Sequence, residues 1–210
     1  MDEIITLHDR IRKFEALINA NKSHRAHKEN KFNKQFSVLL KDWHYLEIIW
    51  NRIEKADLDK DITQLGLDLK SMYVFGRVFS ESLLYMASLF IPTTPKIDWT
   101  KIGVFVKTVS ENLDTQPEDF KKFWASCGER IIYMHETFRY RNHVLHEKDS
   151  NTEWTMVWRK GSNLDHVSIT NVPWVEDRSK KKEVRSLNAR MLVKVLQESS
   201  NTIISYLEKV

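Results

Sequence analysis

Apolar side chains recur at helical spacing along most of the chain. Apolar residues lie three and four positions apart, the periodicity of an amphipathic helix, over residues 3–20, 32–56, 62–90 and 99–113 and in a run from 117 onward that continues into 138–147. Over the second half of 62–90 the apolar residues lie nearly all round the helix, so this helix is predicted to be central.

After residue 151 the hydrophobic period changes from helical to alternating. Trp154, Met156 and Trp158 occupy every second position, a Lys-Gly-Ser-Asn turn sequence follows, and 164–170 alternates again. Two alternating runs around such a turn predict a β-hairpin. A last apolar stripe over 182–208 predicts a C-terminal helix.

Together these patterns predict one all-α domain spanning residues 1–210, a helical bundle of about six helices with a small β-hairpin inserted before the C-terminal helix. The composition agrees, because 5 Gly and 4 Pro in 210 residues leave room for long uninterrupted helices. The single cysteine, Cys127, excludes an internal disulfide and makes a cysteine metal site implausible. No metal and no cofactor is expected.

The net charge and the N-terminal sequence indicate which kinds of partner the protein could have. A net charge of +4 is compatible with a nucleic-acid partner but does not require one. The N-terminus carries no signal-peptide pattern, and the most apolar run, residues 83–92, is too short to span a bilayer. We therefore expect a cytoplasmic protein without a membrane partner.

The richest group of reactive side chains closes the helical run predicted from residue 117 onward. There the sequence reads Arg139-Tyr140-Arg141-Asn142-His143-Val144-Leu145-His146. Arg-His pairs at similar spacing also occur elsewhere in the chain, but only Arg141 is followed at once by Asn142 and then, after three residues, by a histidine.

This stretch resembles the Arg-Asn-x-x-x-His signature of the HEPN superfamily, a group of helical-bundle proteins. The resemblance covers the helical layout and the motif after a long helix, and no other sequence. It implies a metal-independent endoribonuclease that acts as a toxin or phage-defence effector, binds RNA, forms a homodimer and has an antitoxin or other regulatory protein as a possible partner. In a branch of the family a Tyr lies two residues after the His. Here Lys148 takes that place, so control through that Tyr is not expected.

The resemblance implies a role for each motif residue, and the chemistry suits it. His146 is the expected general acid or base, since imidazole transfers protons near neutral pH. Arg141 is expected to stabilise the phosphate charge and Asn142 to orient the reacting groups. Weaker substrate-binding candidates nearby are His135, Arg139, Tyr140 and His143.

Helix geometry sets a condition on this site. On a continuous helix, five steps of about 100° leave Arg141 and His146 roughly 140° apart. Either the helix breaks within the motif, or a second copy of the chain completes the site across a twofold axis. His135 and Arg139 share a polar helix face, which we expect to line the cleft of such a dimer.

Other interpretations stay open. One is a non-catalytic HEPN-like module that binds RNA or a protein partner, and another is an unrelated structural bundle. The basic stretch 178–185 could contact phosphates, and the alternating Trp154 and Trp158 could stack on bases, but a solvated loop and core packing are the simpler interpretations. His44 is interpreted as a core or boundary residue.

Overall fold

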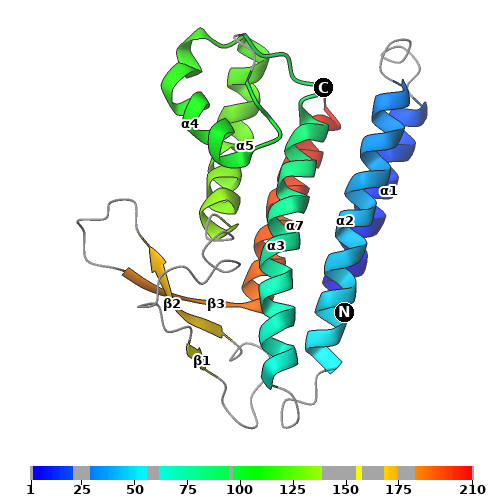
Figure 1. The fold of residues 1–210 in the computed structure, drawn as a ribbon. Coiled ribbons are helices and arrows are strands. Elements are labelled where there is room, and N and C mark those ends of the chain that lie inside the picture. Colours follow the sequence, from blue (N-terminus) through cyan, green and yellow to red (C-terminus); the bar gives the residue numbers. More distant parts are fainter. Residues whose placement is uncertain are drawn as a thin grey trace.

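The computed structural model describes residues 2–20, 29–55, 62–94, 97–138, 155–157, 168–174 and 183–209, and this part of the chain is mostly helical (Figure 1). Its six α-helices are α1 (Asp2–Ala20), α2 (Glu29–Lys55), α3 (Ile62–Ala87), α4 (Ile102–Asn112), α5 (Glu118–Phe138) and α7 (Ala189–Leu207). A short 3-10 helix, η2 (Leu113–Thr115), joins α4 to α5. The helices predicted over 3–20, 32–56, 62–90 and 99–113 are confirmed, with ends that agree to about one turn, and so is the start of the helix predicted from 117 onward.

The long helices lie side by side as a bundle (Figure 1). Helix α3 packs on α2, α7, α5 and α4, so the prediction that it is central is confirmed. Helix α1 lies against α2 and α7, while α5 packs on α7 and α3 and carries α4 on its other side. The apolar faces of all six helices meet in one continuous core.

Aromatic side chains fill much of this core. The rings of Trp43 in α2 and Phe79 in α3 lie 5.2 Å apart between centroids. At the other side of the molecule the buried ring of Trp99 packs on Phe105 of α4 and on Phe120 and Phe123 of α5. Offset and edge-on contacts of this kind stabilise aromatic pairs beyond their burial, and they hold α4 onto α5.

The residues just before α5 favour the start of a helix at this point. Pro117 cannot donate a backbone hydrogen bond, and its carbonyl accepts the amide of Lys121 at 3.0 Å, which opens the helix. The buried side chain of Gln116 accepts the amide of Thr94 at 3.0 Å. The segment that follows α3 is thereby tied to the start of α5.

A small antiparallel sheet lies beside the bundle, between α5 and α7 in the chain (Figure 1). Its strands, in the order β1-β2-β3, are β1 (Thr155–Val157), β2 (Ser168–Trp174) and β3 (Glu183–Asn188). Met156 pairs with Ile169, and the pairing of β2 with β3 shifts register between Ile169 and Val172. The turn of the predicted hairpin lies outside the described residues, so the hairpin as a whole stays a prediction.

The predicted start of the C-terminal helix at residue 182 is wrong. The helix begins at Ala189, because residues 183–188 form β3 and pair with β2. Leu187 lies opposite Ile169 and Val184 opposite Pro173 in this pairing. An apolar residue every third or fourth position in so short a segment suits either element, and here tertiary pairing decides in favour of the strand.

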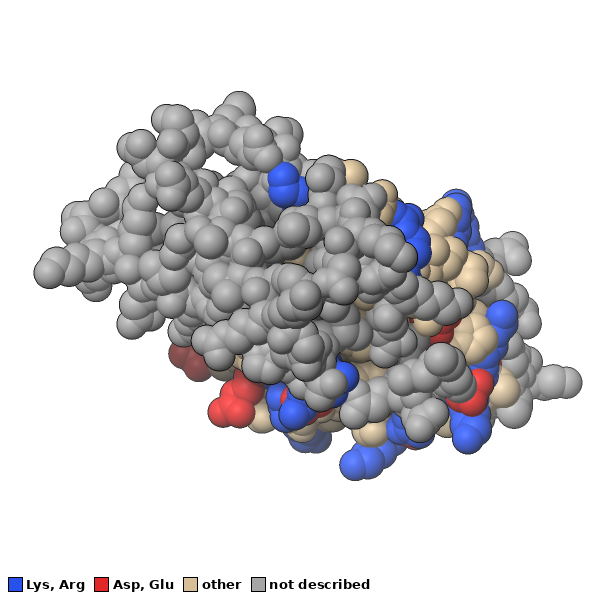
Figure 2. Space-filling model, turned by 90° about the horizontal axis from the view of Figure 1, so that it is seen from below, with Lys and Arg blue, Asp and Glu red and all other residues tan. Residues whose placement is uncertain are grey.

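Charged side chains of both signs lie together on the surface. Seen from below the view of Figure 1, described Lys and Arg side chains lie along one edge with Asp and Glu among them (Figure 2). None of the helices in the described part of the chain is sufficiently long and apolar to cross a membrane.

Candidate functional site

The motif itself lies outside the described residues. Arg139, Tyr140, Arg141, Asn142, His143 and His146 all belong to the stretch 139–150, and α5 is described up to Phe138. The predicted roles of these residues therefore stay predictions. His135 is the one predicted site residue that the structure places, and the elements that hold it also hold Phe138, the last described residue of α5.

The end of α5 is packed tightly against the middle of α3. Phe138, the last described residue of α5, is fully buried and makes an edge-on contact with the ring of Tyr73, with 5.6 Å between centroids. Its ring lies directly on Gly76, where an added Cβ would fall 2.3 Å from the Phe138 Cε1 atom. A residue without a side chain is therefore required at position 76 for α3 and α5 to come this close.

Hydrogen bonds complete this anchor. The buried hydroxyl of Tyr73 donates to the carbonyl of Thr137, the residue before Phe138. The Thr137 hydroxyl donates to the carbonyl of Tyr133 one turn earlier, at 2.8 Å. Both contacts lie in the last described turn of α5, and the Tyr73 bond ties this turn to α3.

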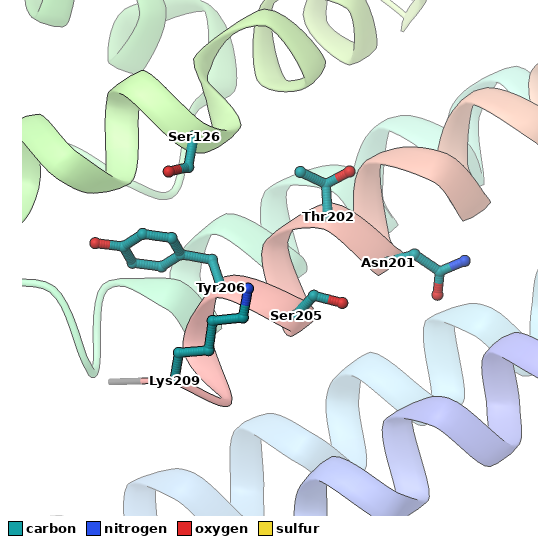
Figure 3. Close-up of a pocket in the computed structure, with 6 residues that line it drawn as sticks. All are labelled: Ser126, Asn201, Thr202, Ser205, Tyr206 and Lys209. Carbon is teal, nitrogen blue, oxygen red and sulfur yellow. The ribbon is translucent and has the colours of Figure 1, made fainter.

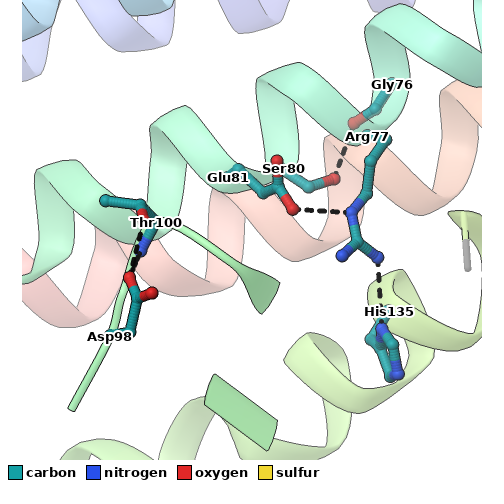
Figure 4. Close-up of polar contacts among 7 residues, drawn as sticks. All are labelled: Gly76, Arg77, Ser80, Glu81, Asp98, Thr100 and His135. Carbon is teal, nitrogen blue, oxygen red and sulfur yellow. Dashed lines mark hydrogen bonds and ion pairs between the residues drawn. The ribbon is translucent and has the colours of Figure 1, made fainter. Parts of the chain in front are cut away.

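His135 lies one turn before this anchor, in a polar cluster with Arg77 and Glu81 of α3 (Figure 4). The Arg77 guanidinium places Nε 2.8 Å from the Glu81 carboxylate and Nη1 3.3 Å from His135 Nδ1. Nearby, the Ser80 hydroxyl donates to the carbonyl of Gly76 at 2.7 Å, so it takes no part in the cluster. The cluster is half-buried, since the Arg77 side chain is 14% exposed and that of Glu81 22%.

The first turn of α4 closes one side of the cluster. An added Cβ at Gly103 would lie 3.1 Å from His135 Cε1 and 3.7 Å from Arg77 Nη2. The chain reaches this position through a turn in which Asp98 accepts hydrogen bonds from the Thr100 hydroxyl and amide at 2.6 and 2.9 Å (Figure 4). These bonds favour the carboxylate and hold the pKa of Asp98 below its usual value.

His135 thus contacts α3 and α4 of its own chain, and the predicted dimer cleft on the polar face of α5 stays a prediction. Sequence reasoning missed Arg77, which lies 58 residues before its histidine partner. One local signal was present, because Arg77 and Glu81 are four residues apart in the mostly apolar second half of α3.

A second polar region is an open groove between the end of α7 and α5, with a volume of about 400 Å³ (Figure 3). It is lined by Ser126, Asn201, Thr202, Ser205, Tyr206 and Lys209. Three of its hydroxyls are engaged. Thr202 donates to Glu198, Tyr206 donates to Asp119, and Ser205 accepts from Arg10. None of the described residues that line the groove is a histidine or a carboxylate that could activate a nucleophile.

Cysteine and metal chemistry find no support in the part of the chain that the structure describes. Cys127 is buried in the core, and burial raises the pKa of its thiol to about 12, which makes it inert. Within the described ranges no three His, Cys, Asp or Glu side chains come together as a metal site. His44, interpreted from the sequence as core or boundary, has a 65% exposed side chain near Glu47, so the core assignment is wrong.

Comparison of the sequence with protein-family models finds no match, and comparisons with curated proteins and with solved structures find none either.

Proposed function

We propose that the protein is a metal-independent endoribonuclease of the HEPN type, acting as a toxin or defence effector. One observation carries the proposal. The Arg141-Asn142-x-x-x-His146 triplet begins three residues after Phe138, the buried residue up to which the long bundle helix α5 is described. The mostly helical bundle agrees with the fold that the motif implies, although fold alone does not determine function.

The proposed reaction breaks the RNA chain by internal transfer of the phosphate. The ribose 2′-oxygen attacks phosphorus, the bond from phosphorus to the 5′-oxygen breaks, and a 2′,3′-cyclic phosphate and a free 5′-hydroxyl result. His146 takes the proton from the 2′-hydroxyl or gives one to the leaving 5′-oxygen. Arg141 offers a fixed fork of donors to the charge that develops on the phosphate, and Asn142 orients these groups.

The test is RNA cleavage by the purified protein in EDTA, compared with the His146→Ala and His44→Ala variants. His44 is the matched control, because its exposed side chain lies on α2 and its loss removes one imidazole without touching the motif. We expect the parent and His44→Ala to cleave, with 2′,3′-cyclic phosphate ends by mass spectrometry. We expect His146→Ala to lose at least about a hundredfold in rate, the usual contribution of one general acid or base.

Two results would contradict this proposal. Equal cleavage by His146→Ala would mean that the motif histidine takes no part in the reaction. Absence of cleavage by all three proteins, with RNA binding retained, would favour a non-catalytic HEPN-like module that binds RNA or a protein partner.

A further inference from the structure

The outer surface of α2 carries positive charge and no exposed acid. The helix packs on α3 and α1, and its remaining side lies on the outside of the bundle (Figure 1). Over residues 34–53, all of which the structure describes, the exposed residues are Lys34, Ser37, Lys41, His44, Tyr45, Ile48, Asn51 and Arg52. A surface with cations of one sign attracts an anionic partner.

The two acidic residues of this stretch are engaged within the chain. Asp42 is buried and accepts a hydrogen bond from the Ser82 hydroxyl of α3. Glu47 accepts the indole N–H of Trp43 at 2.9 Å, lies 3.5 Å from His44 Nδ1, and has a side chain that is 19% exposed. Both carboxylates therefore contribute little charge to the outer surface.

Four of the exposed residues lie in a row along the helix, and they are Lys34, Lys41, Tyr45 and Arg52. They follow one another after seven, four and seven residues. At about 100° per residue, these steps place them within about 40° of one another on one side of α2. At 1.5 Å per residue the row is about 27 Å long. His44 lies outside this α2 row, on the adjoining side with Glu47.

The two lysines of the α2 row form no ion pair with a carboxylate in the described part of the chain. Lysines on other helices, such as Lys107 and Lys121, do pair with an acid about one turn away. Arg52 contacts Asp68 of α3, but its side chain is 53% exposed whereas that of Asp68 is 2% exposed. The row therefore presents three cations along one line, which suits a chain of phosphates.

An aromatic ring lies among these cations. Tyr45 is 37% exposed and packs on Phe75 of α3, with 5.3 Å between ring centroids and 45° between ring planes. The ammonium group of Lys41 lies 5.7 Å from the centre of the Tyr45 ring. A ring held in place beside a cation can stack on an unpaired base while the cation contacts a phosphate.

We propose that the α2 row binds single-stranded RNA, with phosphates on Lys34, Lys41 and Arg52 and a base stacked on Tyr45. A second copy of the chain docked on the row would set cations against cations, which is unfavourable. The row is long enough for about eight nucleotides of a stacked strand, at about 3.4 Å each. It rests on the proposed ribonuclease function, since it holds the substrate of that reaction without using a motif residue.

The experiment measures RNA binding in full-length protein that carries His146→Ala and cannot cleave. Fluorescence anisotropy with a short labelled single-stranded RNA is recorded at several salt concentrations, with and without the pair Lys34→Gln and Lys41→Gln. Two lost phosphate contacts should lower the slope of log affinity against log salt by about 1.4, twice the 0.7 of one contact on a single strand. At about 0.1 M salt this corresponds to a loss of affinity of roughly tenfold or more.

The matched control is the pair Lys107→Gln and Lys122→Gln. These lysines are 77% and 70% exposed on α4 and α5, and their loss changes the net charge by the same amount. The control should keep the slope of the His146→Ala protein. Glutamine and lysine have similar helix propensities, so both pairs should fold.

Tyr45 is tested with two probes, the single strand and a duplex RNA of the same sequence. Tyr45→Ala should weaken binding of the single strand roughly tenfold and leave binding of the duplex unchanged, because stacking on the ring needs an unpaired base. Tyr45→Phe keeps the ring and should bind the single strand as the parent does.

Several results would overturn the α2 row. If both lysine pairs give the same slope and affinity as the His146→Ala protein, the row takes no part in binding and the ribonuclease proposal is untouched. Equal loss of single strand and duplex in Tyr45→Ala would mean that the ring does not stack on a base. If the His146→Ala protein binds anionic lipid vesicles but no RNA, the row is a membrane contact. In that case cleavage by the parent alone decides whether the ribonuclease proposal also fails.

Discussion

Asp42 is a carboxylate that the packing of α2 against α3 removes from water. Its residue is buried, and it accepts a hydrogen bond from the Ser82 hydroxyl of α3. Burial is the largest influence and raises the pKa of Asp42 above its usual value, while the bond from Ser82 and the charge of Lys41 act in the opposite direction. The folded protein therefore holds this proton more tightly than the unfolded chain does.

The consequence is a contribution to stability that depends on pH. Because the folded pKa is raised, Asp42 favours folding most at low pH, and this contribution is lost as pH rises from the unfolded value of about 4 through the folded one. Asp42→Asn keeps an acceptor for Ser82 without the charge. We expect the variant to be more stable than the parent at pH 7, with a difference that disappears below about pH 4. Urea unfolding of both proteins across this pH range measures the difference in their free energies of unfolding.

A matched control for this measurement is Asp114→Asn, because Asp114 is exposed in η2. Its substitution takes no carboxylate out of a buried site, so the free energy of unfolding at pH 7 should change by no more than about 0.5 kcal/mol. A stability gain of Asp42→Asn that grows as the pH falls would contradict the sign derived from burial.

The residues of the candidate site differ in how far the sequence reveals them. His135 was predicted because it lies on the helix that leads into the motif. Arg77 was not, because its role depends on a partner 58 residues away in the chain. A contact between two helices that are distant in the sequence leaves no periodic pattern of residues. By contrast, Arg141, Asn142 and His146 lie in one short stretch, where the order and spacing of the residue types can be recognised.

At the scale of elements, the contact between α3 and the end of α5 depends on one glycine. Gly76→Ala would place a methyl group 2.3 Å from the buried Phe138 ring, and either the ring or the helix must move. Overpacking of this kind typically costs about 1–3 kcal/mol. We expect Gly76→Ala to lower the free energy of unfolding by at least about 1 kcal/mol, measured by chemical denaturation.

A double-mutant cycle tests the cause. Phe138→Leu alone should destabilise the protein by leaving space beside Gly76, but it should make Gly76→Ala less harmful. The two variants should therefore couple by about 0.5–3 kcal/mol, the range for residues in contact. Additive effects would mean that the methyl group is accommodated without contact to the ring.

Most helices could be predicted from the sequence because each long segment keeps one period over several turns. The boundary between β3 and α7 could not. Residues 183–188 are few, and their apolar positions fit a helix as well as a strand. Their state is decided by pairing with β2, a segment that begins at Ser168, and local propensity holds no information about that partner.

At the scale of the whole molecule, the question is how Arg141 and His146 could reach one phosphate. On a continuous helix these residues point roughly 140° apart. A symmetric dimer resolves this if the arginine comes from one subunit and the histidine from the other. Two inactive variants should therefore restore activity to each other when mixed if the site is composite, but not if each site lies within one chain.

Mixing two inactive variants distinguishes the arrangements. In a mixed dimer of Arg141→Ala and His146→Ala, one composite site carries both substitutions and the other carries neither. Random exchange makes half of the dimers mixed, each with one intact site, so activity should return to about a quarter of the parent level. Cleavage is measured after equal amounts of the two variants have been denatured and refolded together, with each variant refolded alone as the control. Light scattering should give the mass of a dimer for all samples. If the mixture stays as inactive as its components while the dimer forms, each site is built within one chain, and the motif must then depart from a continuous helix.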